Sequence, residues 1–446
     1  MGATPANATR LRCNRRSSSS GDSAAKDIVI RRATRETAHV HLLSDHNRSE
    51  FLATPQLVRL DHAKGEDGRF EPSLLIKGDA LVLKYLVRGV RVQFVAARVR
   101  GDRLLYGLLV FDDPAHPAML WSVMEREQEQ LAMFALAGGE PCQLFLFNEF
   151  AINVAWNDLP VNFSSSRLGS LAASAALGPA DHSVLHAAVD DVIGRALGAD
   201  PADPELLVVD LPVLTDWRMV NNSLVTNSAG ISHLDAFDAD EGRQQERVIA
   251  WLTDNLFPLV AIDQPRVHKG GKLRELTDAL LSYPLGTFLF ESKALSLLDR
   301  PTLPDRSTLA KNLLGHVAKA ARQLKGATRQ VKAGTDILDE KGNAHDIERT
   351  RPIHAIILVP DIRLLPDTFG ADLMHDFMAA TGGYLHLLDP SELLRIVQTT
   401  AEFVRRSESQ LVTPMMAFDS RLIARAEQCA ANGSLVVEIV THFEDR

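Results

Sequence analysis

Two neighbouring stretches near the middle of the chain decide the fold. Residues 274–278 read Arg-Glu-Leu-Thr-Asp, and residues 286–295 read Gly-Thr-Phe-Leu-Phe-Glu-Ser-Lys-Ala-Leu. Each stretch has the length and composition of a β-strand. Because side chains two residues apart share a face of an extended strand, Glu291 and Lys293 project together. Asp278 on a neighbouring strand then completes a cluster of two acids and one lysine.

The chemistry of this cluster indicates a metal site. Two carboxylates at one strand end supply the hard oxygen ligands that Mg²⁺ prefers, and Mn²⁺ accepts the same ligands. A lysine beside them can orient a water molecule or balance the charge of a phosphate. The candidate metal ligands are therefore Asp278 and Glu291, and Lys293 is the third candidate catalytic residue.

These residues resemble the motif of the PD-(D/E)XK nuclease superfamily, whose fold is restriction-endonuclease-like. The resemblance covers roughly residues 241–400. It gives Asp278 the place of the first metal-binding acid, Glu291 that of the second, and Lys293 that of the lysine. The chain departs from the family pattern where Thr277, and not proline, precedes the first acid. That departure leaves Glu275, three residues earlier, as an alternative first acid.

The resemblance implies a mixed-sheet αβββαβ domain with metal-dependent nuclease activity. Members of the family often carry an additional acid on the helix before the metal strands, a position that Glu246 matches. They commonly direct a Gln or basic residue of the helix after the Glu-x-Lys strand at the substrate, and Gln323 and Arg322 are the candidates here. The alternative for these helix residues is an ordinary solvent-facing surface.

The expected order of elements supports this fold. From residue 241 the apolar periodicity predicts a helix, a strand or link, two strands, a helix, a strand, a helix, a strand and a helix. Ser307 is the expected cap of the long helix. The continuous apolar run at 353–359 is typical of a central strand buried on both faces. A helix at 420–431 and a strand at 435–440 follow.

The chain divides into three expected parts. Residues 1–25, rich in Ala, Ser, Arg and Asn, predict a disordered leader. Residues 26–235 predict an α+β accessory domain with an antiparallel sheet, and residues 236–446 predict the nuclease-like domain with a C-terminal extension. The expected fold class is therefore α/β and α+β.

Turn signals predict the local connections. Residues 81–87 and 90–98 are apolar runs on either side of Arg-Gly, so they predict a β-hairpin. Residues 221–230 are typical of a loop, and residues 267–272 of a turn that leads into the strand with Asp278.

Length, hydropathy and cysteine content exclude several classes of protein. The 446 residues suggest two or three domains, and no run of eighteen apolar residues occurs, so we expect no membrane association. The three cysteines, Cys13, Cys142 and Cys429, are too far apart for a disulfide framework or a zinc site. These features predict a cytoplasmic protein.

The charge is unevenly distributed. The net charge of −9 argues against a protein that coats nucleic acid. Between Arg306 and Lys332, however, seven Lys and Arg residues occur and no acid does. This basic helix is a candidate surface for phosphates.

The sequence therefore predicts a metal-dependent nuclease that hydrolyses phosphodiester bonds of nucleic acid, with DNA ranked ahead of RNA. An alternative from a different class is a non-catalytic nuclease-fold scaffold or protein-interaction module, in which the acidic N-terminal domain binds a protein partner. The acidic remainder of the chain and the lack of a recognisable DNA-reading motif favour that alternative.

Overall fold

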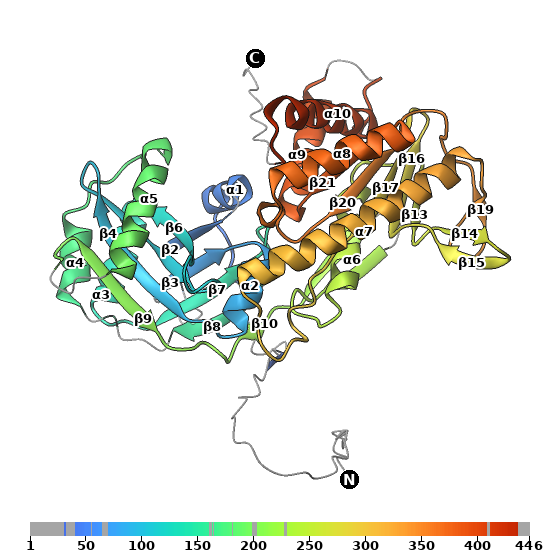
Figure 1. The fold of residues 1–446 in the computed structure, drawn as a ribbon. Helices are drawn as coiled ribbons and strands as arrows, with labels where there is room; N and C mark the ends of the chain where they lie inside the picture. Colours follow the sequence, from blue (N-terminus) through green and yellow to red (C-terminus); the bar gives the residue numbers. More distant parts are fainter. Residues whose placement is uncertain are drawn as a thin grey trace, which may run out of the picture.

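The computed structural model describes residues 31–32, 41–54, 56–64, 70–159, 163, 165–180, 182–198, 203–226, 230–407 and 411–435. Two lobes lie side by side in Figure 1, an N-terminal lobe of residues 31–220 and a C-terminal lobe of residues 222–435. Helices and mostly antiparallel sheets are mixed throughout, which confirms the expected fold class, α/β and α+β. The expected leader lies outside the described residues, as does the expected strand at 435–440 apart from its first residue.

Two β-sheets form the N-terminal lobe. The six-stranded sheet is antiparallel apart from two parallel pairs, so it is more mixed than the sequence suggested. The four-stranded sheet is antiparallel throughout. In spatial order the first consists of β1 (Arg31–Arg32), β10 (Arg218–Met219), β8 (Asn153–Leu159), β7 (Cys142–Phe147), β3 (Phe70–Lys77) and β2 (Leu57–Lys64), and the second of β6 (Ala118–Val123), β5 (Arg103–Val110), β4 (Val92–Val99) and β9 (Leu206–Leu211).

The two sheets share one apolar core, to which Leu74 of β3 and Phe94 of β4 both belong. A helix covers the other face of each sheet: Phe51 of α1 packs on the six-stranded sheet, and Val192 of α5 on the four-stranded sheet. Leu136 and Leu168 of two further helices close the core. These helices are α1 (Asp45–Ala53), α3 (Glu127–Ala137), α4 (Ser166–Ala173) and α5 (His182–Leu197).

Helix α2 (Ala80–Val87) stands where the sequence predicted the first strand of a hairpin, so that prediction is wrong. Residues 81–87 are all buried, and a helix that is apolar on every side shows no helical period in its sequence. The signal for a helix was Asp79, whose carboxylate accepts a hydrogen bond from the Val82 N–H at 2.8 Å and so caps the first turn.

A five-stranded mixed sheet forms the centre of the C-terminal lobe. Strands β13, β16 and β17 are antiparallel, whereas β17, β20 and β21 are parallel. The apolar run at 353–359 supplies the buried strand that the sequence predicted. In spatial order the strands are β13 (Val260–Asp263), β16 (Ala279–Tyr283), β17 (Gly286–Ser292), β20 (His354–Leu358) and β21 (Tyr384–Leu388).

Helices cover both faces of this sheet. Leu289 of β17 packs with α7 on one face, where α8 also lies, and Phe290 packs with α6, α9 and α10 on the other. The result is a three-layer sandwich, and Figure 1 shows α7 crossing in front of the strands. The bounds are α6 (Glu241–Asp254), α7 (Arg306–Lys332), the short 3₁₀ helix η1 (Ile362–Leu364), α8 (Asp367–Thr381), α9 (Pro390–Arg406) and α10 (Pro414–Asn432).

The element order from α6 onwards is helix, three strands of the central sheet, helix, strand, helix, strand, helix. This order confirms the one predicted from the sequence. One detail of α7 differs, because the helix begins earlier than expected. Asp305 is its N-cap, and the carboxylate accepts hydrogen bonds from the Thr308 N–H at 2.6 Å and from the Ser307 hydroxyl at 3.0 Å.

Two hairpins occupy stretches where the sequence predicted loops or turns. Residues 222–234 form β11 (Asn222–Thr226) and β12 (Gly230–Leu234), which pack on α6 through Leu224 and Leu234. Residues 266–275 form β14 (Arg266–Lys269) and β15 (Lys272–Glu275). These join β18 (Ile337–Leu338) and β19 (Ala344–His345) in a small sheet of order β15-β14-β18-β19.

Helix α2 joins the two lobes. The Lys84 ammonium forms a buried ion pair with the Glu241 carboxylate of α6 at 2.8 Å. The Tyr85 hydroxyl donates to the Pro304 carbonyl at 2.5 Å, and the Arg88 guanidinium donates to the Leu298 carbonyl at 2.7 Å. One buried apolar cluster runs through both lobes, so the contact between them is part of the core.

Candidate active site

The predicted site residues meet at one end of the central sheet. Because β16 is antiparallel to β13 and β17, the beginning of β16 lies beside the ends of the other two strands. Asp278 immediately precedes β16, Glu291 lies near the end of β17, and Lys293 follows that strand. The antiparallel pairing of β16 and β17 therefore places Asp278 beside the end of β17, where Glu291 and Lys293 lie.

Hydrogen bonds fix the positions of the three residues. The Asp278 carboxylate accepts from the Ser292 backbone N–H at 2.5 Å. The Lys293 ammonium donates to the Glu291 carboxylate at 2.7 Å, and both side chains are mostly buried. The Thr277 hydroxyl contacts the second oxygen of Glu291 at 3.4 Å. The same hydroxyl donates a shorter hydrogen bond to the Phe290 carbonyl, so Thr277 ties the segment before β16 to β17.

Asp278 lies at the centre of a larger group of acids. Burial raises its pKa, and its negative charge in turn raises the pKa of the half-buried Glu246 and the buried Glu291, in both cases after the larger effect of burial. Its charge also raises the pKa of Asp263 and Glu275, which keep exposed side chains but lose part of their hydration; for Asp263 the charge of Glu340 has a larger effect than that of Asp278. For Glu246 the combined effect is a pKa of about 7. A group of acids that oppose one another's ionisation attracts a cation.

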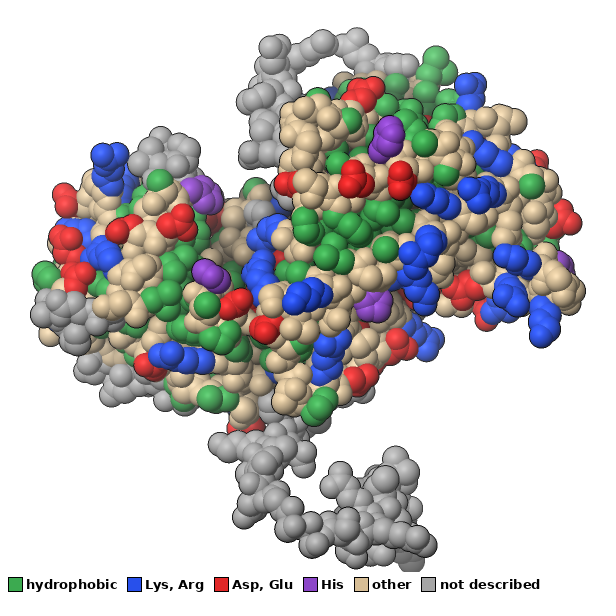
Figure 2. All heavy atoms as spheres, in the orientation of Figure 1, with side chains coloured by type: hydrophobic (Ala, Val, Ile, Leu, Met, Phe, Trp, Pro, Cys, Tyr) green, Lys and Arg blue, Asp and Glu red, His purple; other side chains and the backbone are tan. Residues whose placement is uncertain are grey.

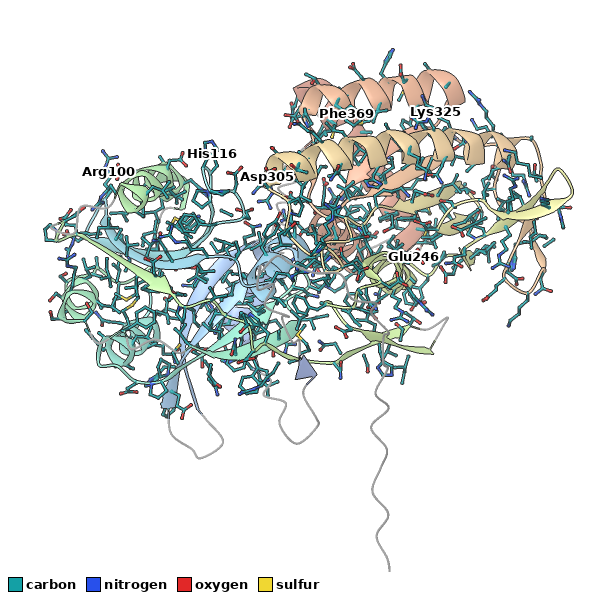
Figure 3. The ribbon with its side chains drawn as sticks, turned by 60° about the horizontal axis from the view of Figure 1, so that its bottom comes forward. Arg100, His116, Glu246, Asp305, Lys325 and Phe369 are labelled. Carbon is teal, nitrogen blue, oxygen red and sulfur yellow. The ribbon has the colours of Figure 1, made fainter. Side chains whose placement is uncertain are left out.

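The additional acids come from different elements. Glu246 lies on α6, where it accepts a hydrogen bond from the Gln264 side chain at 3.3 Å, and Figure 3 labels it on the opposite side of the sheet from Lys325 of α7. Glu275 ends β15 and is exposed. Asp278 lies beside the ends of β13 and β17, whereas Glu275 ends the exposed strand β15, so Asp278 remains the candidate first acid and Glu275 the alternative.

Asp263 is an acid that sequence reasoning missed. It ends β13 opposite Ala279, the residue after Asp278. The signal was available, because an acid that ends a strand lies at the same sheet edge as the acid that precedes its antiparallel neighbour. The strand that ends at Asp263 is short, so neither the strand nor its pairing with the next strand could be predicted from the sequence.

The donor chemistry of this group suits Mg²⁺ or Mn²⁺, because every acid supplies carboxylate oxygen. Within the described residues, no three His, Cys, Asp or Glu side chains form a ready ligand set for a metal ion. The hydrogen bond from Ser292 to Asp278 and the ion pair from Lys293 to Glu291 engage these carboxylates instead. Binding an ion would require the side chains to rearrange.

Helix α7 contributes a second set of polar residues. His316 is close enough to Lys293 that the lysine charge lowers the pKa of the imidazole, an effect second to burial. Lys319 and Gln323 lie three and seven residues further along, so they share the face of the helix with His316. Gln323 therefore remains a candidate for substrate contact on the same side as the site.

Arg322 lies on a different face of α7. It is exposed and shares its stripe with Lys325, three residues later. Lys325 points towards the α8 side of α7 in Figure 3, and the Lys332 ammonium at the end of the helix donates to the Thr381 carbonyl of α8 at 2.6 Å. Both substrate-contact candidates, Arg322 and Gln323, are exposed on α7.

Comparisons with known proteins give no family for this chain: no family model matches it, and no similar curated protein or solved structure was found. None of the helices in the described part of the chain has both the length and the apolar character needed to cross a lipid bilayer.

Proposed function

We propose that the C-terminal lobe is a metal-dependent nuclease of the PD-(D/E)XK type, which hydrolyses phosphodiester bonds of nucleic acid. The observation that carries this proposal is the group of acids around Asp278 at the end of the mixed sheet, with Lys293 bonded to Glu291. The succession of α6, three strands, α7 and β20 supports it, because the resemblance to that superfamily implies the same αβββαβ order.

Asp278 and Glu291 would hold the metal ion once their side chains rearrange from the hydrogen bonds to Ser292 and Lys293. A bound Mg²⁺ or Mn²⁺ supplies two effects, a lowered pKa of a coordinated water and neutralisation of charge on the phosphate. Lys293 would position the attacking water. In the hydrolysis the water oxygen bonds to phosphorus, one ester P–O bond breaks, and the departing oxygen takes up a proton.

Glu246 is suited to exchange a proton. Its pKa of about 7 means that both protonation states are populated near neutral pH, which is the property a general base needs. It is half-buried, and its carboxylate accepts a hydrogen bond from the Gln264 side chain.

The test is cleavage of a panel of duplex and single-stranded DNA and RNA by the full-length protein, with Mg²⁺, with Mn²⁺ and with EDTA. We expect metal-dependent cleavage by the unmodified protein and a loss of at least about 100-fold in Glu291→Gln and in Lys293→Ala. Glu291→Gln keeps the side-chain volume and removes the charge.

Glu140→Gln is the matched control, because Glu140 is exposed in the N-terminal lobe. It should cleave as the unmodified protein does, and all variants should show the same circular dichroism spectrum. A protein that cleaves no substrate with either ion, and whose melting temperature ignores both, would refute the nuclease and leave the interaction-module alternative.

A further inference from the structure

The hairpin β14–β15, called the ribbon below, projects from the C-terminal lobe as a two-stranded structure. Residues 268–275 are exposed without interruption, whereas Val267 and Leu276 at its base are buried. Beyond Arg266, which pairs with Leu338 of β18, no other strand flanks the ribbon among the described residues. The base of the ribbon is thus held by β18, and the rest of its surface is free to meet a partner.

The turn of the ribbon is tight, and no other part of the described structure lies close to it. Gly270 and Gly271 have φ of +58° and +75°, the conformation of a tight hairpin turn. A Cβ atom at either position would meet nothing within 4 Å. The glycines are therefore needed for the turn and leave a narrow tip.

One face of the ribbon carries only positive charge. Lys269 lies directly opposite Lys272, and Arg274 shares that face because it pairs with Val267. Like charges directly across a strand pair are destabilising, and no ion pair to a carboxylate compensates these three side chains in the described part of the protein. Figure 2 shows Lys and Arg side chains gathered over this end of the molecule. A polyanion bound to this face would relieve the repulsion.

In sequence, the ribbon lies between two acids of the candidate active site. Asp263 lies three residues before its first residue, and Asp278 three residues after its last. At about 3.3 Å per residue, four residues per strand place the tip roughly 13 Å from the base. Phosphates of a molecule held on the ribbon would therefore reach the acids.

We propose that the ribbon docks double-stranded DNA by entering its major groove, with Lys269, Lys272 and Arg274 as the residues that hold the backbone. The major groove of B-DNA is about 12 Å wide and admits a two-stranded ribbon. The major groove of double-stranded RNA is too deep and narrow for side chains to read. This inference rests on the proposed nuclease function, since it assigns the substrate surface of that site.

The experiment measures binding of the full-length protein to a 30-base-pair DNA duplex in EDTA over a series of salt concentrations. The triple variant Lys269→Gln, Lys272→Gln, Arg274→Gln should bind the duplex more weakly and lower the log–log salt slope by up to about 3, since each phosphate contact contributes about 0.9. The charge-matched control Arg48→Gln, Arg100→Gln, Arg405→Gln changes three exposed cations outside the ribbon and outside the basic helix α7, and it should keep the slope.

Two further arms use one strand of the same DNA and an RNA duplex of the same sequence. The inference requires the unmodified protein to prefer the DNA duplex, and the triple variant to lose that preference while its melting temperature does not fall. An unchanged slope in the triple variant, or an equal loss for all three nucleic acids, would overturn docking in the DNA groove.

The binding experiment tests the ribbon inference and the cleavage experiment tests the nuclease proposal, so either can be refuted without the other. A triple variant that binds and cleaves like the unmodified protein removes the ribbon inference and leaves the nuclease standing. A protein that binds the duplex through the ribbon but cuts nothing with Mg²⁺ or Mn²⁺ removes the nuclease and leaves the docking surface.

Discussion

Glu149 is a carboxylic acid buried where the two lobes meet. Its carboxyl group accepts a hydrogen bond from the Ala80 N–H at the start of α2, at 2.7 Å. Burial is the main reason that its pKa is raised to about 7, and the nearby charges of Asp79 and Asp389 raise it further. The folded protein therefore favours the protonated form of Glu149.

This shift predicts a pH dependence of stability. Because the folded pKa lies above the ordinary value of 4.5, the contribution of Glu149 to stability is complete below that pH and is lost as the pH rises through about 7. Glu149→Gln keeps an acceptor for the Ala80 N–H and should be more stable than the unmodified protein at pH 8, by on the order of 3 kcal/mol. Urea unfolding at pH 5 and pH 8 measures the stability difference between the variant and the unmodified protein. An equal difference at both pH values would contradict the raised pKa of Glu149.

The sequence could propose Glu291 and Lys293 as neighbours from strand alternation, a local property, and Asp278 from the strand expected beside them. It could not identify His316, whose position beside Lys293 results from how a helix packs across the sheet. It also could not choose between Asp278 and Glu275, because that choice depends on which carboxylate is buried among the others.

At the scale of elements, patterns failed where burial or solvent contact is uniform. Helix α2 is buried on all sides and its residues are branched and apolar, so they have the composition of a strand. The ribbon is exposed on both faces beyond Val267, and its polar residues and paired glycines are typical of a turn. The amphipathic helix α6 and the buried strands β17 and β20 were predicted correctly, because each has one clear pattern.

The cap of α7 gives a prediction at this scale. Asp305→Ala removes the acceptor for the Thr308 N–H and should destabilise the protein by about 1 kcal/mol, which is typical of a lost N-cap. Ser307→Ala, at the cap position expected from the sequence, should cost only a few tenths of that. Chemical denaturation measures the free energy of unfolding of both variants. Equal losses of stability in the two variants would contradict the assignment of Asp305 as the cap.

At the scale of the whole molecule, the lobes share a core and a buried ion pair. Lys84→Ala leaves the Glu241 carboxylate buried without its cation, and this should destabilise the protein by about 3–5 kcal/mol. Arg405→Ala, which breaks an exposed ion pair with Glu402, is the control and should cost less than about 1 kcal/mol.

The same contact predicts that the lobes unfold together. Fluorescence of the tryptophans and far-ultraviolet circular dichroism should give a single coincident transition in urea. Two separated transitions would show that the shared core does not couple the lobes.

The parallel pairing of β17 with β20 has a consequence for how the chain reaches this structure. Phe288 lies opposite His354, and all of α7 lies between them in sequence. Such a pair forms only after a long loop closes, which is slow because the entropy of the loop is lost before the contact is gained. Refolding from urea should therefore take from milliseconds to about seconds. Until β20 pairs with it, the edge of β17 is open to other chains, so the yield of refolded protein should fall as its concentration rises.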